Sequence, residues 1–240
     1  MAELSSKASR RDLLISGAAV AVGALSRSVS PLPPVQPLPR PALLPRPDLS
    51  PAPLSIRPPA AAPAQPAAAR FSVDPRLLQK ALAALDRHAD VIKAHDRIAI
   101  VDFTAPSSEA RLHFLDVVSG KACRLLVAHG SGSDPAHTGF LKSFSNAFGS
   151  NASSEGAFLT EDYYVGKHGR SQRLVGLDPT NNNALDRAVV IHGAWYANDD
   201  MIRAHGKLGR SQGCFAVGEN KLGDVFGFLG KGRLVYAARA

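Results

Sequence analysis

The sequence predicts a mainly β domain of the α+β class that spans residues 71–240. From residue 97 onward, short β-branched runs recur between turns rich in Gly, Ser and Asn, which is typical of strands. Few helical patterns separate these runs, so a parallel α/β sheet is not expected. The lower boundary of the domain comes from composition, because 14 of the 18 prolines lie between Pro31 and Pro66.

The first 70 residues are predicted to stay outside this domain. Arg10 and Arg11 precede a short apolar run, which is typical of a twin-arginine export signal over residues 1–26, with an uncleaved anchor as the alternative. Residues 27–70 are rich in Pro and Ala and are predicted to form an extended, disordered linker. We therefore expect an exported protein of the periplasm or cell envelope, which contacts the membrane only through an uncleaved signal.

The elements of the domain are predicted from its amino terminus onward. A helix begins at Asp74 and Pro75, an N-cap followed by proline at the first position. The apolar residues that follow at helical spacing are Leu78, Leu82, Leu85, Ala89 and Ile92. Strands are expected at residues 97–104, 111–118, 122–128, 163–165, 172–177, 188–192 and 233–238. Residues 130–155 are dominated by Gly, Ser and Asn and are expected to form a long functional loop.

The charge of the chain bears on its partners. The formal net charge is +8 and the pI is about 9.8. The positive residues are scattered, and no stretch interleaves them with aromatic residues, which disfavours nucleic acid as a partner. A moderately basic surface suits an anionic polymer such as a bacterial cell wall. We therefore expect no nucleic-acid partner.

The two cysteines have different sequence surroundings. Cys123 lies in an apolar run, where it is expected to be a buried strand residue that behaves as a small hydrophobe. Cys214 directly follows Gly213 in a glycine-rich turn, which suits a reactive group. A disulfide between the two cysteines is therefore not expected, although an exported protein would permit one.

Cys214 and His192 form the pair with the clearest chemical potential. An apolar strand ends at His192 and Gly193 follows at once, whereas Gly213 directly precedes Cys214. An imidazole can take the proton of a thiol, stabilise the thiolate and later protonate a leaving amine. Backbone N–H groups around Gly213 and Cys214 could stabilise the negative charge on the attacked carbonyl. The spacing alone leaves a buried His and a structural Cys as the other interpretation.

The residues around this pair resemble a known family. His192-Gly193 followed by Ser211-Gln212-Gly213-Cys214 resembles the signature of YkuD-type L,D-transpeptidases. Residues 164–169, 188–196 and 207–211 resemble the branch of murein L,D-transpeptidase catalytic-domain proteins, and the resemblance covers about residues 97–217. Gln212 replaces the second His of the signature, and Ala216 stands where many members carry Arg or Asn. The resemblance implies an L,D-transpeptidase-like β-sandwich or barrel with an amino-terminal helix and long loops.

The resemblance also implies a reaction on the stem peptides of peptidoglycan. Cys214 would attack the carbonyl of the third stem residue, a diamino acid, and release the terminal D-alanine to leave a thioester. Attack by an amine of a neighbouring stem would form a cross-link, whereas attack by water would make the enzyme an L,D-carboxypeptidase. Neither route requires a metal or an organic cofactor. Carbapenem-type inhibitors are further expected partners of Cys214.

The site residues fall into two predicted groups. The catalytic group is Cys214, His192, Gly193 and Gly213. The substrate-binding group is Ser211, Arg210, Tyr164, His168 and His129, in which the guanidinium of Arg210 suits a substrate carboxylate. A zinc site built from His129, His168 and His192 is disfavoured, because Cys214 would then have no role.

Two other functions stay open at the level of sequence. One is a different cysteine peptidase or amidase of the cell wall, although papain-like enzymes place the Cys before the His and sortases have a wider gap between them. The other is a wall-binding module without turnover, against which the intact His192 and Cys214 argue.

Overall fold

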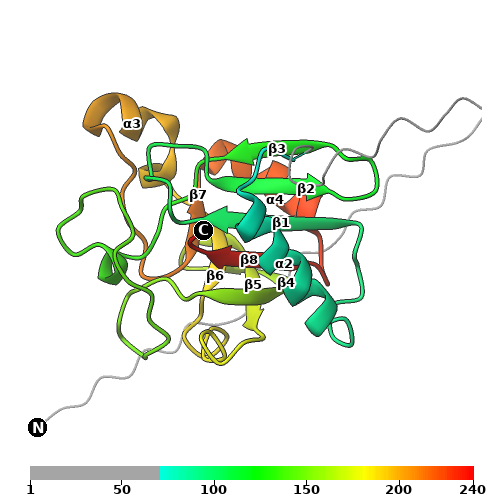
Figure 1. The fold of residues 1–240 in the computed structure, drawn as a ribbon. Coiled ribbons are helices and arrows are strands. Elements are labelled where there is room, and N and C mark those ends of the chain that lie inside the picture. Colours follow the sequence, from blue (N-terminus) through cyan, green and yellow to red (C-terminus); the bar gives the residue numbers. More distant parts are fainter. Residues whose placement is uncertain (1–70) are drawn as a thin grey trace, which may run out of the picture. The chain divides into compact units, whose positions relative to one another are not determined.

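The computed structural model describes residues 71–240 (Figure 1). The export signal and the linker predicted for residues 1–70 lie outside the described residues. The described part contains a mixed eight-stranded sheet with the strand order β3-β2-β1-β8-β4-β5-β6-β7. The prediction of a mainly β domain is therefore confirmed. Within residues 71–240, none of the helices has the length and apolar character needed to cross a membrane.

The elements have the following bounds. The strands are β1 (Arg97–Asp102), β2 (Leu112–Asp116), β3 (Ala122–Leu125), β4 (Gly156–Gly166), β5 (Gly169–Gly176), β6 (Val190–Gly193), β7 (Phe215–Val217) and β8 (Leu234–Ala238). The α-helices are α2 (Pro75–Arg87), α3 (Asp199–His205) and α4 (Leu222–Leu229). Short 3₁₀ turns are η1 (Ser131–Ser133), η2 (Trp195–Ala197) and η3 (Glu219–Lys221).

Helix α2 packs on one face of the sheet. Asp74 caps the helix, because its carboxylate accepts hydrogen bonds from the N–H groups of the next turn at 2.8 and 3.3 Å. The buried side chains of α2 are Leu77, Leu78, Ala81, Ala84 and Leu85, and they belong to the same apolar cluster as residues of β1 and β8. The row of apolar residues predicted to lie on this helix was too long, because the helix ends at Arg87 and His88 is its C-cap. Ala89 therefore lies beyond the helix, as does the fully buried Ile92.

Helix α4 covers the opposite face of the sheet (Figure 1). On this side the rings of Phe103, Phe158 and Phe215 meet inside the core. The ring centroids of Phe158 and Phe215 are 5.3 Å apart in an edge-to-face arrangement, and those of Phe103 and Phe215 are 6.3 Å apart. Because Phe215 directly follows Cys214, its burial anchors the carboxyl end of the turn that carries the thiol.

The sheet differs from the predicted one in the length of some strands, and it contains two parallel pairings that the sequence did not predict. Strand β4 covers Gly156–Gly166, whereas the sequence predicted a strand only at residues 163–165. Its buried first half pairs with both β5 and β8, and this tertiary pairing extends it. Strands β1 and β8 pair in parallel, as do β6 and β7. The second of these pairings places His192 opposite Ala216, and so brings His192 and Cys214 onto neighbouring segments.

The prediction for Cys123 was wrong in part. Cys123 lies in a strand, β3, but its side chain is exposed and not buried. The physical reason is that β3 lies at an edge of the sheet and presents its first three residues to solvent. Both cysteines are free, with Cys214 buried.

Candidate active site

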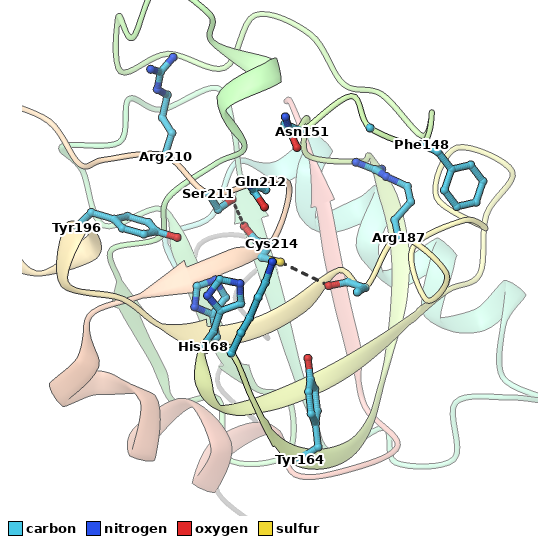
Figure 2. Close-up of a pocket in the computed structure, with 14 residues that line it drawn as sticks. Phe148, Asn151, Tyr164, His168, Arg187, Tyr196, Arg210, Ser211, Gln212 and Cys214 are labelled. Atoms are coloured by element: carbon cyan, nitrogen blue, oxygen red, sulfur yellow. Dashed lines mark hydrogen bonds between the residues drawn. The ribbon is translucent and has the colours of Figure 1, made fainter. Parts of the chain in front are cut away.

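Ser211 holds the turn that carries Cys214. The Ser211 N–H donates to the carbonyl of His129 at 2.9 Å, and the Ser211 carbonyl accepts from the Ser131 N–H at 2.8 Å. The Ser211 hydroxyl accepts from the Gly213 N–H at 3.1 Å and donates to the Cys214 carbonyl at 2.7 Å. The hydroxyl predicted to bind substrate is therefore used inside the turn, where it fixes the backbone on both sides of Gln212 and Gly213 (Figure 2).

Gly213 occupies a position that only glycine fits. Its φ is +109°, a conformation that side chains with a Cβ rarely adopt. A Cβ atom added there would lie 2.8 Å from the carbonyl oxygen of Ala152 and 3.2 Å from Nη2 of Arg187. The glycine before Cys214 thus allows the turn to pack closely against the loop around Ala152.

Gly213→Ala is expected to lower turnover by about 10²-fold, because relief of the clash with Ala152 moves the neighbouring thiol by a fraction of an ångström or more. The backbone strain also costs about 1–3 kcal/mol of stability. The matched control is Gly206→Ala, at φ +70° with no heavy atom within 4 Å of the added Cβ. This control is expected to lose stability but to keep its turnover. Equal turnover in the two variants, measured with the tetrapeptide substrate that the family resemblance implies, would contradict this role of Gly213.

The thiol of Cys214 is buried and held by the backbone of the segment before β6. Its Sγ donates to the carbonyl of Ala188 at 3.6 Å. Ala188 has a φ of +55°, which is unusual for a residue other than glycine and points its carbonyl at the thiol. Burial raises the pKa of Cys214, while the Val190 N–H and the cations of Lys167 and Arg187 act in the opposite direction. The resting group is therefore a neutral thiol.

The ring of His192 has the tautomer that a general base requires. Its Nδ1 lies 2.9 Å from the carbonyl oxygen of Gly193, and because a carbonyl only accepts, Nδ1 carries the proton and donates. The lone pair is then on Nε2. Burial lowers the pKa of His192, the bond to Gly193 opposes this, and His168 and Lys167 lower it further. His192 is therefore neutral at neutral pH and ready to accept a proton.

His168 contacts His192 directly. It lies in the tight turn between β4 and β5, and its ring stacks on that of His192 with centroids 4.4 Å apart and an interplanar angle of 23°. Burial lowers the pKa of His168, and Lys167 lowers it further. The hairpin formed by β4 and β5 thus supplies one wall of the site and fixes the plane of the base.

A pocket of about 690 Å³ surrounds the thiol. It brings together Cys214, His192, Tyr164, His168, Arg210 and Ser211, six of the predicted site residues. In Figure 2 the labelled side chains of Tyr164, Tyr196 and Arg187 lie around Cys214 from different segments. The charged residues lining it are the cations Lys167, Arg187 and Arg210; within residues 71–240, no Asp or Glu contributes to its wall. The pocket therefore suits an anionic ligand.

The prediction that His129 lines the cleft was wrong. Its side chain is 1% exposed and lies in a buried network behind the turn that carries Cys214, which is called the nucleophile turn below after its predicted role. Nδ1 accepts from Nη2 of Arg111 at 2.8 Å, and Nε2 lies 3.4 Å from a carboxylate oxygen of Asp134. Burial and the adjacent cation of Arg111 lower the pKa of His129 to about 4. The backbone carbonyl of His129, which accepts from Ser211, is what links this residue to the site.

This network predicts a loss of stability in acid. His129 titrates near 6.5 when unfolded and at about 4 when folded, so the unfolded chain binds the extra proton as the pH falls through this window. Stability is therefore retained above pH 6.5 and decreases toward pH 4, by on the order of 3 kcal/mol for this group.

His129→Gln keeps an acceptor for Arg111 and a donor for Asp134 but does not titrate. Urea unfolding at several pH values is expected to show a shallower decline of the free energy of unfolding in this variant than in the wild-type protein. The same decline in both proteins would mean that other groups cause the acid sensitivity. Because slopes are compared, a uniform loss of stability in the variant does not affect the result.

Some pocket residues were not predicted from the sequence. Arg187, Ala188, Lys167 and Tyr196 line the pocket but were not among the predicted site residues, although all except Arg187 lie in stretches that resemble the family. Burial raises the pKa of Tyr196 to about 12, and Cys214 adds to this effect. For Lys167 a signal was present, because it lies beside His168 within a stretch already compared with the family. For Arg187 the sequence offered no signal.

No group of three or more His, Cys, Asp or Glu side chains that could hold a metal ion occurs in the described residues. The three histidines considered for zinc are also not arranged as one ligand set. His129 is bonded to the guanidinium of Arg111, whereas His168 and His192 stack face to face.

Comparison with known families places this geometry in context. The model of the family described as L,D-transpeptidase catalytic domain matches residues 69–238. The chain belongs to this family. The family identification made from the His192 and Cys214 motifs is thereby confirmed. The described domain is an enzyme domain of the L,D-transpeptidase class.

Several solved structures, L,D-transpeptidases among them, are similar to this chain at low identity. The helical cell shape determining protein Pgp2 from Campylobacter jejuni has 14% identity and a TM-score of 0.39, covering 70% of this chain and 57% of that chain. The L,D-transpeptidase from Mycobacterium smegmatis has 10% identity and a TM-score of 0.37, covering 60% and 58%. LdtMt1, solved in complex with imipenem, has 10% identity and a TM-score of 0.36, covering 60% and 59%. The match thus spans under two thirds of these other chains. No match was found among curated proteins.

Proposed function

We propose that this domain is a peptidoglycan L,D-transpeptidase in which Cys214 is the nucleophile and His192 its general base. The observation that carries the proposal is the shared pocket of the two side chains, in which His192 has its lone pair on Nε2. The cationic lining supports an anionic substrate such as a stem peptide with free carboxylates. Arg210 is the candidate carboxylate ligand, because one of its terminal nitrogens donates to the carbonyls of Asp134 and Pro135, which fixes its position in the wall.

The first step starts from a neutral thiol and a neutral imidazole. The thiol turns from the Ala188 carbonyl, and Nε2 of His192 accepts its proton as sulfur attacks the carbonyl carbon of the third stem residue. A carbon–sulfur bond forms, and the carbonyl π electrons move to oxygen. Because the Gly213 N–H already donates to Ser211, the Cys214 N–H is the proposed donor to this oxyanion.

The second step releases the terminal residue. The tetrahedral intermediate collapses, the carbon–nitrogen bond to D-alanine breaks, and the imidazolium of His192 donates its proton to the departing amine. A thioester on Cys214 remains. An acceptor amine then attacks the thioester carbonyl and His192 takes the amine proton. The carbon–sulfur bond breaks, and His192 returns the proton to sulfur, which regenerates the thiol. Attack by water gives the L,D-carboxypeptidase reaction through the same intermediate.

Two further parts of the proposal concern partners and location. Carbapenem-type β-lactams are proposed to acylate Cys214, since their carbonyl carbon is an electrophile for the same thiol; LdtMt1 has been solved with imipenem. Export to the periplasm or cell envelope is proposed from the paired Arg10 and Arg11. Neither acylation by β-lactams nor export depends on whether an amine or water attacks the thioester.

The test uses the full chain with Cys123→Ser, which leaves Cys214 as the single thiol. This protein is incubated with a disaccharide-tetrapeptide and followed by intact-mass analysis of protein and products. The expected results are D-alanine release and a thioester adduct on Cys214, with cross-linked dimers from amine attack and tripeptides from water attack. The ratio of the two products separates transpeptidase from carboxypeptidase. If the folded protein shows neither D-alanine release nor an adduct on Cys214, the proposed chemistry is rejected.

A further inference from the structure

Arg187 joins the loop around residues 145–154 to the pocket wall. Its Nη1 donates to the Ser145 carbonyl at 2.9 Å and to the Ser154 hydroxyl at 2.6 Å. Its Nη2 donates to the Ser150 hydroxyl at 3.2 Å and to the Ala152 carbonyl at 2.7 Å. Both terminal nitrogens are therefore fully used by one loop, so that the guanidinium plane is fixed in position.

The same guanidinium touches the nucleophile turn. A Cβ atom at Gly213 would lie 3.2 Å from Nη2 of Arg187 and 2.8 Å from the Ala152 oxygen that this nitrogen binds. The next residue, Ala188, presents its carbonyl to the Cys214 thiol at 3.6 Å. Figure 2 shows Arg187 and Cys214 facing the same cavity. The Arg187 side chain therefore packs against the turn before Cys214. Its neighbour in the sequence, Ala188, supplies the carbonyl that accepts the hydrogen bond from the thiol.

The charge of Arg187 also acts on the Cys214 thiol. The cation lowers the pKa of Cys214, against the larger effect of burial, and the Cys214 charge in turn raises that of Arg187. Lys167 also lowers the pKa of Cys214 and has the larger effect of the two cations, but its side chain is exposed in the turn between β4 and β5, whereas Arg187 is half-buried. The charge of Arg187 differs in that four hydrogen bonds hold it in place.

We propose that Arg187 is a positioning residue of the reaction, which clamps the 145–154 loop against the nucleophile turn and stabilises the Cys214 thiolate with a fixed positive charge. The inference rests on the proposed role of Cys214. It assigns two separable effects to one side chain: the hydrogen bonds order the loop and the turn, and the charge sets the fraction of thiol that is ionised.

The test compares Arg187→Met and Arg187→Lys in the full chain carrying Cys123→Ser. The rate of Cys214 alkylation by iodoacetamide is measured against pH, since only the thiolate displaces iodide. Arg187→Met is expected to shift the midpoint upward and to lower the rate at pH 7 by about 2-fold, because burial, the Val190 N–H and Lys167 affect this pKa more strongly than Arg187 does. Arg187→Lys is expected to keep a midpoint near that of wild type while losing tetrapeptide turnover, because it cannot make the four hydrogen bonds. The other titratable and charged groups that line the pocket are unchanged in both variants; they are Tyr164, Lys167, His168, His192, Tyr196 and Arg210.

Arg203→Met, in the exposed helix α3, is the control for the change in net charge and is expected to match the wild-type profile. An unshifted midpoint in Arg187→Met would overturn the role of the charge, and unchanged turnover in Arg187→Lys would overturn the clamp. Arg187→Gln tests the charge in the same way if Arg187→Met does not fold. A failure of the proposed function appears in the wild-type arm as absent tetrapeptide turnover, whereas a failure of this inference appears only in the variants.

Discussion

Cys214→Ala is expected to lower tetrapeptide turnover by at least about 10⁴-fold and to abolish the thioester adduct, because no other group in the pocket can replace the sulfur nucleophile. Binding of the stem should persist, since the cations Lys167 and Arg210 are untouched. The side chain is buried, so the substitution leaves a small cavity that costs on the order of 1 kcal/mol of stability.

The matched control for this prediction is Cys123→Ala. Cys123 is exposed on the edge strand β3, and its replacement is expected to leave turnover and stability unchanged. Residual D-alanine release by Cys214→Ala within about 10-fold of wild type would contradict a cysteine mechanism. Binding of tetrapeptide without turnover in the wild-type protein would instead favour the wall-binding module.

His192→Asn is expected to lower kcat/KM by about 10²–10⁴-fold, because the thiol loses the group that takes its proton. The asparagine amide can still donate to the Gly193 carbonyl, which preserves the local backbone while removing the base. The pH profile adds a second readout. The pKa of His192 lies below the ordinary value of 6.5, so the acid limb of the wild-type profile should lie below pH 6.5.

In His192→Asn this acid limb should disappear, and the residual rate should rise with pH through the ionisation of Cys214 alone. Stopped tetrapeptide assays between pH 4.5 and 9.5, with circular dichroism at each pH, provide the measurement. A variant that keeps both the wild-type rate and the acid limb would show that another group, such as the stacked His168, is the base.

Arg187 belongs to the residues that are proposed to position Cys214 and to affect its pKa, beside the proposed catalytic pair itself. The charges that oppose the effect of burial on Cys214 come from two separate segments, the β4–β5 hairpin and the segment before β6. Gly213→Ala and Arg187→Lys each alter one side of the packing contact between Gly213 and Arg187, and tetrapeptide turnover measures the effect of each. If the contact positions the thiol, the two substitutions should not be additive when combined.

The sequence by itself determined the class of the domain and its family, and it predicted the candidate catalytic pair of His192 and Cys214. Short β-branched runs and the capped helix at Asp74 are local patterns, and local backbone preferences suffice to predict them. His192 and Cys214 were recognisable because each lies beside a glycine in a short motif that resembles one family. Gly213 could also be predicted, since the residue before a buried nucleophile must permit close packing.

Only the tertiary structure decided which other residues complete the site. His129 lies near the motif in the fold, yet the buried guanidinium of Arg111 and the carboxylate of Asp134 hold its ring away from the pocket. Arg187 carries no motif, and it reaches the thiol because the chain before β6 folds back on the loop around Ala152. The exposure of Cys123 likewise follows from the place of β3 at the sheet edge. Each of these outcomes depends on contacts between segments distant in sequence, which local composition and spacing do not encode.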